Sequence, residues 1–403
     1  MKRDWKTILK GLAGGLAVLV FGGIVLFFVY LFANFGLTKP YLIRMVPVIG
    51  IALLVPLTIA ATGFVGKKWM RRLWLVSFAV FAGCLMYIGQ GIYYDVLPGV
   101  DDRTLILQDY IPFAEDTKAV KLEEESTLQF TDTKWLRLDG ATALYPVYSA
   151  FVQAVYPDPQ ETETYSPYNS KVECGGTIRA YERLISGEVD MIFVAGPSVE
   201  QLKMAEKAGK ELSLTPIGRE AFVFFVNSKN PVESLTVEEI QGIYTGEIKN
   251  WKELGGKWQR IRPFQRAENS GSQTSLQKLM AGLPLMEPEE EDRIAGMGGI
   301  IRSVASYRNH SNAIGFSFRY YSTEMVKNGD IRLLALNGVE PTKETIRDDS
   351  YPIASEFYAV TAAPVGTKPF EERNRTAREF LDWILSEQGQ WIIEETGYVS
   401  LHG

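Results

Sequence analysis

The chain has 403 residues, of which 46% are hydrophobic, and its formal net charge is −6. An acidic balance without clustered basic residues argues against a nucleic-acid-binding surface. The hydrophobic residues are concentrated in the first hundred positions, so the sequence predicts a membrane region followed by a soluble domain.

Three apolar stretches dominate this N-terminal region, and they cover residues 8–35, 42–65 and 73–94. Each reaches the roughly 20 residues that a helix needs to span a bilayer. We expect an all-α membrane region over residues 1–97. Burial in a soluble core is the alternative, but buried helices rarely lack a polar face for so long. The first stretch is also too long for a cleaved signal peptide.

The orientation of the three helices follows from the basic residues near their ends. These residues precede the first stretch and fill the second loop: Lys2, Arg3, Lys6, Lys10, Lys67, Lys68, Arg71 and Arg72. Such residues favour the cytoplasmic side. We therefore expect a multi-pass protein of the cell membrane with a cytoplasmic N-terminus and an extracytoplasmic C-terminal domain.

Residues 98–135 are polar and charged, and they are expected to form a linker or a strap packed on the following domain. From residue 136 onward, short apolar runs alternate with helical patterns. The run Val189–Ala195, for example, follows a helical pattern over Ile178–Ile185. This alternation predicts an α/β fold over residues 136–403.

Two β-rich runs, at 221–227 and 356–361, are separated by more than a hundred residues that contain their own strands and helices. Two chain crossings between two lobes would explain this pattern. We expect lobe 1 at about 136–226 and 356–403, and lobe 2 at about 227–355. Thr236 and Glu239 predict a capping box at a helix start, and a C-terminal helical pair is expected to break near Gly389.

Catalytic and metal-binding patterns are weak in this sequence. It has two histidines, His310 and His402, and no Walker loop, nucleophile elbow or cysteine–histidine cluster. Cys84 and Cys174 lie in different environments and are not expected to pair. We expect no enzyme, no metal and no cofactor.

The most informative segment is 265–275, where Ser270, Gly271 and Ser272 precede an apolar-periodic helix and Arg266 lies just before them. Amides at a helix start have no intrahelical acceptor and attract anions. An arginine fork suits a tetrahedral oxyanion. The alternative is an ordinary helix cap that binds nothing.

Two further turns have a similar pattern. Residues 139–146 place Thr142 before a helix, and residues 174–177 place Gly176 and Thr177 before another. Glycine there lets the backbone approach a ligand closely, although a turn that needs glycine would look the same. The helix starts at Thr142 and Ser270, if they face each other, could share one anion, and the turn at 174–177 is a third candidate.

These residues resemble the phosphate-binding receptors of bacterial ABC transporters, within the periplasmic binding protein superfamily. The resemblance covers about residues 138–401. It rests on five segments, at 140–148, 187–190, 266–272, 313–316 and 389–399. It implies a two-lobed fold of type II and capture of a small oxyanion, most often phosphate.

The same resemblance implies roles for individual residues. Arg266, Ser270, Gly271 and Ser272 look like the family's ligand loop, with Ser272 in place of the usual threonine. Glu268 matches a carboxylate that holds the arginine. From the two further turns, at 139–146 and 174–177, Ala141, Thr142, Gly176 and Thr177 complete the expected ligand set.

Ala143 stands where the family usually has an aromatic residue, but another departure from the family pattern matters more. Ala195 stands where the family has an aspartate that accepts the proton of hydrogen phosphate, and losing that acceptor would weaken discrimination against sulfate. Glu173 is an alternative source of a carboxylate.

Two functions are therefore carried forward. The first is a membrane-anchored receptor that delivers an oxyanion, most simply phosphate, to the permease of an ABC transporter. The second is a membrane sensor or assembly protein that uses a binding-protein-like domain with altered or no solute binding.

Overall fold

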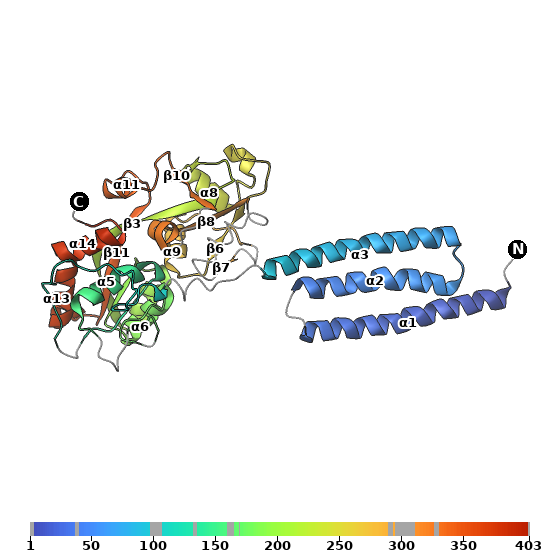
Figure 1. Cartoon of the computed structure of the whole chain (residues 1–403), viewed down its shortest axis with the longest axis horizontal. Helices are drawn as coiled ribbons and strands as arrows, with labels where there is room; N and C mark the ends of the chain where they lie inside the picture. The colour runs from blue at the N-terminus through green and yellow to red at the C-terminus, as the bar shows by residue number, and fades with distance from the viewer. Residues whose placement is uncertain are drawn as a thin grey trace. The chain divides into compact units, whose positions relative to one another are not determined.

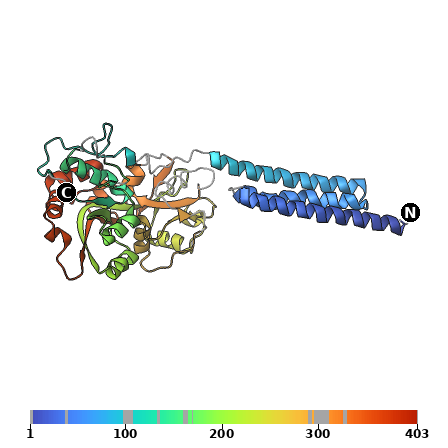
Figure 2. The same cartoon turned by 90° about the horizontal axis from the view of Figure 1, so that it is seen from below.

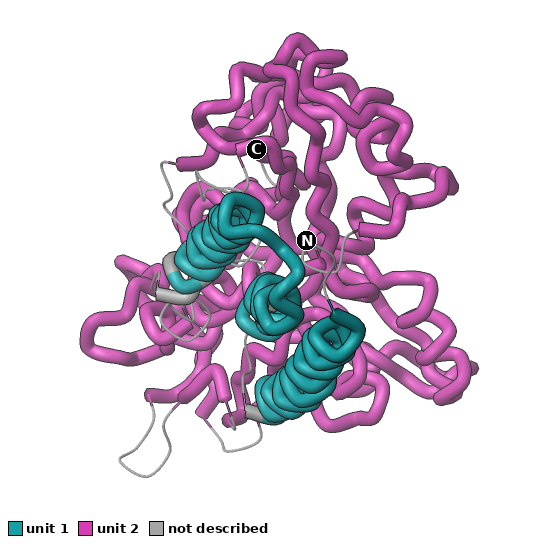
Figure 3. Tube along the Cα trace, turned by 90° about the vertical axis from the view of Figure 1, so that its right-hand side faces the viewer, with its two compact units in different colours: residues 1–100 teal, residues 101–403 magenta. Residues whose placement is uncertain are grey.

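The computed structural model describes residues 4–36, 40–96, 107–131, 135–158, 165–168, 170–288, 293–294, 311–325 and 330–401. The chain divides into two compact units, residues 1–100 and 101–403 (Figure 3).

The first unit consists of the helices α1 (Trp5–Gly36), α2 (Pro40–Thr62) and α3 (Lys67–Val96), and α2 packs against both neighbours (Figures 1 and 2). All three are long and apolar enough to cross a membrane, which confirms the predicted apolar helices. Small residues bring α1 close to α2. A Cβ atom on Gly11 would lie 2.4 Å from the carbonyl oxygen of Thr62, and one on Gly15 would lie 2.7 Å from its methyl group.

Near the start of the second unit, residues 107–131 pack on the α/β domain that follows them in the sequence. Leu107 is buried. The amide of Phe113 donates to Gln153 Oε1 (3.0 Å), and the amide of Phe130 donates to the carbonyl of Val155 (2.8 Å). We call this segment the strap.

A seven-stranded mixed sheet forms the centre of the second unit. Its order is β1 (Leu138–Gly140), β2 (Met191–Ala195), β11 (Ala354–Pro364), β3 (Lys210–Asn227), β8 (Ala313–Phe318) and β5 (Arg262–Pro263), with β9 (Ile331–Leu333) paired to β3. β1 and β2 are parallel, and β11 is antiparallel to its neighbours.

The long strand β3 divides this sheet into two halves. Residues 210–221 of β3 pair with β11, whereas residues 222–226 pair with β8. We call the part with β1, β2 and β11 the β2 half, and the part with β8, β5 and β9 the β8 half. The change of partner lies between Ala221 and Phe222.

Helices and short strands complete each half (Figure 1). In the β2 half they are η1 (Thr142–Leu144), α5 (Tyr145–Val155), α6 (Thr177–Ser186), α7 (Val199–Lys207), α12 (Phe370–Arg373), α13 (Arg375–Ile384) and α14 (Glu387–Thr396). In the β8 half, which takes up the chain between β3 and β11, they are β4 (Ser234–Leu235), α8 (Val237–Thr245), η2 (Trp251–Leu254), β6 (Gln265–Arg266), α9 (Gly271–Leu279), β7 (Arg293–Ile294), η4 (Tyr321–Met325), β10 (Ala335–Leu336) and α11 (Lys343–Arg347).

Local signals were accurate at the start of α8 and less accurate near the C-terminus. The capping box is confirmed, because Thr236 Oγ1 accepts from the amide of Glu239 (3.0 Å) and Glu239 Oε2 accepts from the amide of Thr236 (2.8 Å).

The C-terminal helical pair, α13 and α14, breaks at residues 385–386, so the expected break near Gly389 is wrong. Gly389 lies inside α14, where a Cβ atom would come within 2.3 Å of the carbonyl oxygen of Ile384. Close packing, and not a turn, requires glycine there.

Candidate functional site

The loop between β6 and α9 presents a helix start beside an arginine. Ser270 is the N-cap residue, and its hydroxyl accepts from the amide of Gln273 (3.4 Å). The Gln273 side chain in turn accepts from the amide of Arg266 (2.9 Å). Gly271 and Ser272 follow as the first residues of α9, where helix geometry leaves amides without intrahelical acceptors. Gln273 thus ties Arg266 to the helix start.

The loop after β1 is held closely against β2. The amide of Ala141 donates to the carbonyl of Phe193 (2.8 Å). Gly140 is required at this point, because a Cβ atom on it would lie 2.7 Å from the same carbonyl oxygen. Thr142 then begins η1. The Ala141 amide is therefore already used by the protein, whereas the Thr142 side chain lines the cavity described below.

The third loop precedes α6 and is hydrogen-bonded to the loop after β1. The amide of Gly176 donates to the carbonyl of Gly140 (3.0 Å), so this amide is also used by the protein. Gly176 has a φ of 81°, a conformation that favours glycine. Thr177 follows as the first residue of α6.

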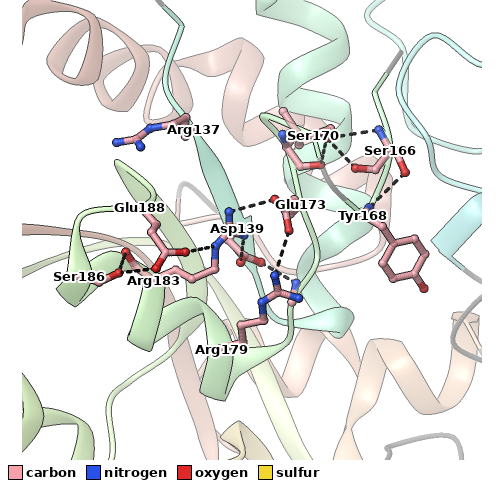
Figure 4. Close-up of polar contacts among 12 residues, drawn as sticks. Arg137, Asp139, Ser166, Tyr168, Ser170, Glu173, Arg179, Arg183, Ser186 and Glu188 are labelled. Atoms are coloured by element: carbon pink, nitrogen blue, oxygen red, sulfur yellow. Dashed lines mark hydrogen bonds and ion pairs between the residues drawn. The ribbon is translucent and has the colours of Figure 1, made fainter. Parts of the chain in front are cut away.

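A buried ion-pair network, shown in Figure 4, ties these two loops together. Asp139 is fully buried, and its Oδ1 accepts from the amides of Gly140 (2.8 Å) and Gly175 (2.6 Å). Arg183 donates to Asp139 Oδ2 (2.7 Å) and to Glu173 Oε1 (2.9 Å). Because one carboxylate binds both glycine loops and one guanidinium holds that carboxylate, the network fixes the loops relative to each other.

All eight ligand residues expected from the sequence line one cavity of about 460 Å³. They are Ala141, Thr142, Gly176, Thr177, Arg266, Ser270, Gly271 and Ser272. The first four come from the β2 half, and the last four come from the loop at β6 and α9. The fold therefore brings together three loops that are far apart in the sequence.

The charge on the described wall of this cavity is positive. Arg266 is 7% exposed, whereas the Arg179 side chain is 57% exposed and lies 3.8 Å from Glu173 Oε2. Among the described residues that line the cavity, none is aspartate or glutamate. The described wall thus suits an anion.

Ser272 provides a polar group that no other described residue uses. Its side chain is buried, and its Oγ has no hydrogen-bond partner among the described residues. Buried hydroxyl groups are normally hydrogen-bonded. Ser272 is one of the residues that line the cavity, so its hydroxyl is a candidate ligand group.

Ala195 stands where an aspartate that accepts a proton was expected, and this position lies beside the start of α9. Ala195 ends β2, and its carbonyl accepts from the hydroxyl of Tyr181 (3.0 Å). A Cβ atom on Gly271 would lie 3.7 Å from the Ala195 methyl group. The alternative carboxylate, that of Glu173, is bound by Arg183, and Glu173 is not among the described residues that line the cavity.

Two other groups bear on the chemistry. Glu268 Oε2 accepts from Gln277 Nε2 (2.7 Å), and its expected support of Arg266 stays a prediction. Burial raises the pKa of the Cys174 thiol to about 12, so this wall residue remains a neutral thiol and a poor nucleophile at neutral pH. His310 and His402 lie outside the described residues.

Sequence reasoning missed three residues around the cavity. Asp139 and Arg183 were not assigned a role. A signal for Asp139 was present, because an aspartate between a predicted strand and a glycine can accept hydrogen bonds from the amides of the following loop. Leu107 of the strap lines the cavity. No local pattern pointed to it, because its partners are distant in sequence.

The fold and this cavity define an α/β ligand-binding module, and the comparisons specify the family. The PBP superfamily domain matches residues 115–388, and the chain belongs to that superfamily.

Two groups of relatives illustrate the similarity. The phosphate-binding protein PstS of Borreliella burgdorferi is 25% identical over 272 residues, which cover 66% of this chain and 90% of that protein. PstS of Staphylococcus aureus strain RF122 is 24% identical over 239 residues, which cover 58% of this chain and 70% of that protein. Among solved structures, a Clostridium perfringens substrate-binding protein with bound phosphate is 24% identical, has a TM-score of 0.51, and matches over 66% of this chain and 100% of that one. That structural likeness supports the fold.

Proposed function

We propose that this chain is a membrane-anchored, extracytoplasmic solute-binding protein that captures a small oxyanion, with phosphate the first candidate, for uptake by an ABC transporter. The observation that carries this proposal is the convergence of eight residues from three loops on one cavity with a positive described wall. The names of the PstS relatives support phosphate as the ligand.

Within this proposal, each group has a defined task. Arg266 and the hydroxyl groups of Thr142, Thr177, Ser270 and Ser272 bind the anion, together with the first amides of α9. Ala141 and Gly176 shape the wall, since their amides already donate to Phe193 and Gly140. The two halves act as lobes, and β3 and β11 connect them. The family, a superfamily of binding proteins, supports a role in binding for this set of groups.

Calorimetric titration of the full chain in detergent with phosphate and then sulfate tests this function. Arg266→Ala is expected to weaken phosphate binding about 30-fold or more, because it removes the buried charged partner of the anion. Arg378→Ala is the matched control, since Arg378 is exposed on α13. Absence of phosphate and sulfate binding by folded protein would refute the receptor.

The proposed topology places the N-terminus in the cytoplasm and the second unit outside, because basic residues flank the first helix and fill the second loop. Lys257 is exposed and both native cysteines are buried. A membrane-impermeant thiol reagent should therefore label Lys257→Cys in intact cells and leave the native chain unlabelled. Labelling that requires lysis would reverse the orientation.

A second candidate function, membrane sensing, is favoured by one observation. Leu107 lies eleven residues beyond the last residue of α3 and is part of the cavity wall, so ligand binding acts on the segment that leads to the membrane helices. Co-purification separates the two functions. A transport receptor should recruit a permease and an ATPase, whereas a sensor should bind phosphate without them.

A further inference from the structure

The cavity is larger than an inorganic anion requires, although the two halves already touch. Ser198 Oγ, at the start of α7, lies 2.9 Å from Asn269 Oδ1, and Gln201 Nε2 donates to the Asn269 carbonyl (3.1 Å). A Cβ atom on Gly271 would lie 3.2 Å from Thr177 Oγ1. The volume of about 460 Å³ is thus measured between walls in contact.

This volume leaves room for an organic group beside the anion. A water molecule takes about 30 Å³ in the liquid, and a phosphate ion is only a few water molecules in size. Most of the cavity would remain unfilled by phosphate alone. Cavities of this size are typical of small organic ligands.

The remaining wall has the chemistry that an organic group needs. Besides the anion-binding residues, Arg179 and four small residues, the described lining contains six larger apolar or aromatic residues: Leu107, Pro167, Tyr168, Ile178, Phe318 and Tyr321. Tyr168 is 46% exposed and Ile178 is 37% exposed, so these two present most of the accessible apolar surface, whereas Leu107 (2%) and Phe318 (9%) lie almost buried behind it. An inorganic oxyanion gains nothing from such surface, whereas an apolar substituent gains by leaving water.

The charged groups favour an anion without a proton. The described lining residues include Arg179 and Arg266 and no carboxylate that could accept a P–OH proton. Hydrogen phosphate carries such a proton at neutral pH. A phosphate monoester loses its second proton with a pKa of about 6, and its fourth oxygen carries carbon instead of hydrogen.

We propose that the preferred ligand is a phosphate monoester with a small apolar substituent. Its phosphoryl group lies against Arg266, Ser272 and the start of α9, and its substituent lies against the apolar and aromatic lining residues, of which Tyr168 and Ile178 are the most exposed. The proposal rests on the receptor function proposed above and specifies the class of solute.

The test is calorimetric titration of the full chain in detergent at pH 8 with inorganic phosphate, methyl phosphate and phenyl phosphate. Phenyl phosphate should bind at least about tenfold more tightly than inorganic phosphate, since apolar contacts in a pocket commonly produce such ratios. Methyl phosphate should fall between them.

A pair of variants shows whether the described wall causes this preference. Tyr168 is 46% exposed, so Tyr168→Ala should fold, and the ratio of phenyl phosphate to inorganic phosphate affinity should fall toward one. The matched control is Trp258→Ala, an aromatic residue that is 80% exposed and is not among the described lining residues, which should keep the ratio.

The outcomes separate this inference from the proposed function. Inorganic phosphate that binds as tightly as both esters, or more tightly, would overturn the inference and leave the phosphate receptor standing. Folded protein that binds none of the three would overturn both. An ester preference that survives Tyr168→Ala and disappears in Leu107→Ala would support the inference with a different part of the wall in contact.

Discussion

The two sides of the cavity are built differently. On the side of β1 and α6, the Ala141 and Gly176 amides donate to protein carbonyls, and the buried Asp139 carboxylate holds both glycine loops. On the side of α9, the Ser272 hydroxyl has no partner among the described residues. The first side, which we call the frame, is therefore held by its own hydrogen bonds, whereas the second side, which we call the binding side, has a hydroxyl group that no described residue uses.

Breaking the frame should have the largest effect. Arg183→Met leaves Asp139 buried without its guanidinium and leaves Glu173 with only Arg179, at 3.8 Å. Loss of one partner in a buried pair typically costs about 3–5 kcal/mol of unfolding free energy. Thermal unfolding of the full chain, followed by circular dichroism, measures this loss.

Arg137→Met is the matched control for this experiment. Arg137 pairs with Asp190 at 2.9 Å, but its side chain is 47% exposed. Exposed pairs contribute about 0–1 kcal/mol. Equal losses in the two variants would show that the buried network does not hold the loops, and that the backbone bonds alone define the frame.

Glu220 connects the two halves and should make stability depend on pH. It is buried on β3 beside the change of partner, and its carboxylate accepts from the amides of Ala221 (2.9 Å) and Tyr320 (3.1 Å). Burial raises its pKa from 4.5 to about 7. A raised pKa in the folded state means stability that is complete below pH 4.5 and is lost as pH rises through 7.

The expected loss between pH 4.5 and 8 is about 3 kcal/mol, and Glu220→Gln should remove most of this dependence. Melting temperatures of the full chain across this range measure it. Glu200→Gln, on an exposed position of α7, serves as the control. An unchanged pH profile in Glu220→Gln would mean that Glu220 titrates as an ordinary surface carboxyl group.

Features that depend on neighbouring residues could be predicted from the sequence. The three apolar helices, the capping box of Thr236 and Glu239, and the turns before α6 and α9 all have local signals. The α/β class follows from alternation of such elements. The grouping of the three turns at one cavity came from the family resemblance, because nothing local relates Thr142 to Ser272.

Features that depend on distant residues could not be predicted. Asp139 and Arg183 are 44 positions apart, so no spacing rule pairs them. The use of the Ala141 amide depends on Phe193, and the wall position of Leu107 depends on the path of the strap. A glycine pattern reports close approach, and it does not say whether the approaching group is a ligand or the protein's own carbonyl.

The smallest predicted effect tests the binding side of the cavity most directly. Ser272→Ala removes a buried hydroxyl group that no described residue uses, so the protein should lose no stability. Anion affinity should fall about tenfold or more, because a hydrogen bond to a charged group contributes roughly 1.5–3 kcal/mol. Titration with phosphate, beside a melting curve, measures both.

Thr274→Val provides the matched comparison within the same helix. Thr274 Oγ1 is also buried without a partner among the described residues, but Thr274 is not among the described residues that line the cavity. This variant should be at least as stable as the native chain and should bind the anion unchanged. If both variants weaken binding equally, α9 acts through its overall position. If only Ser272→Ala weakens binding, the Ser272 hydroxyl itself contacts the ligand. The difference between the frame and the binding side can then be assigned to this one hydroxyl group.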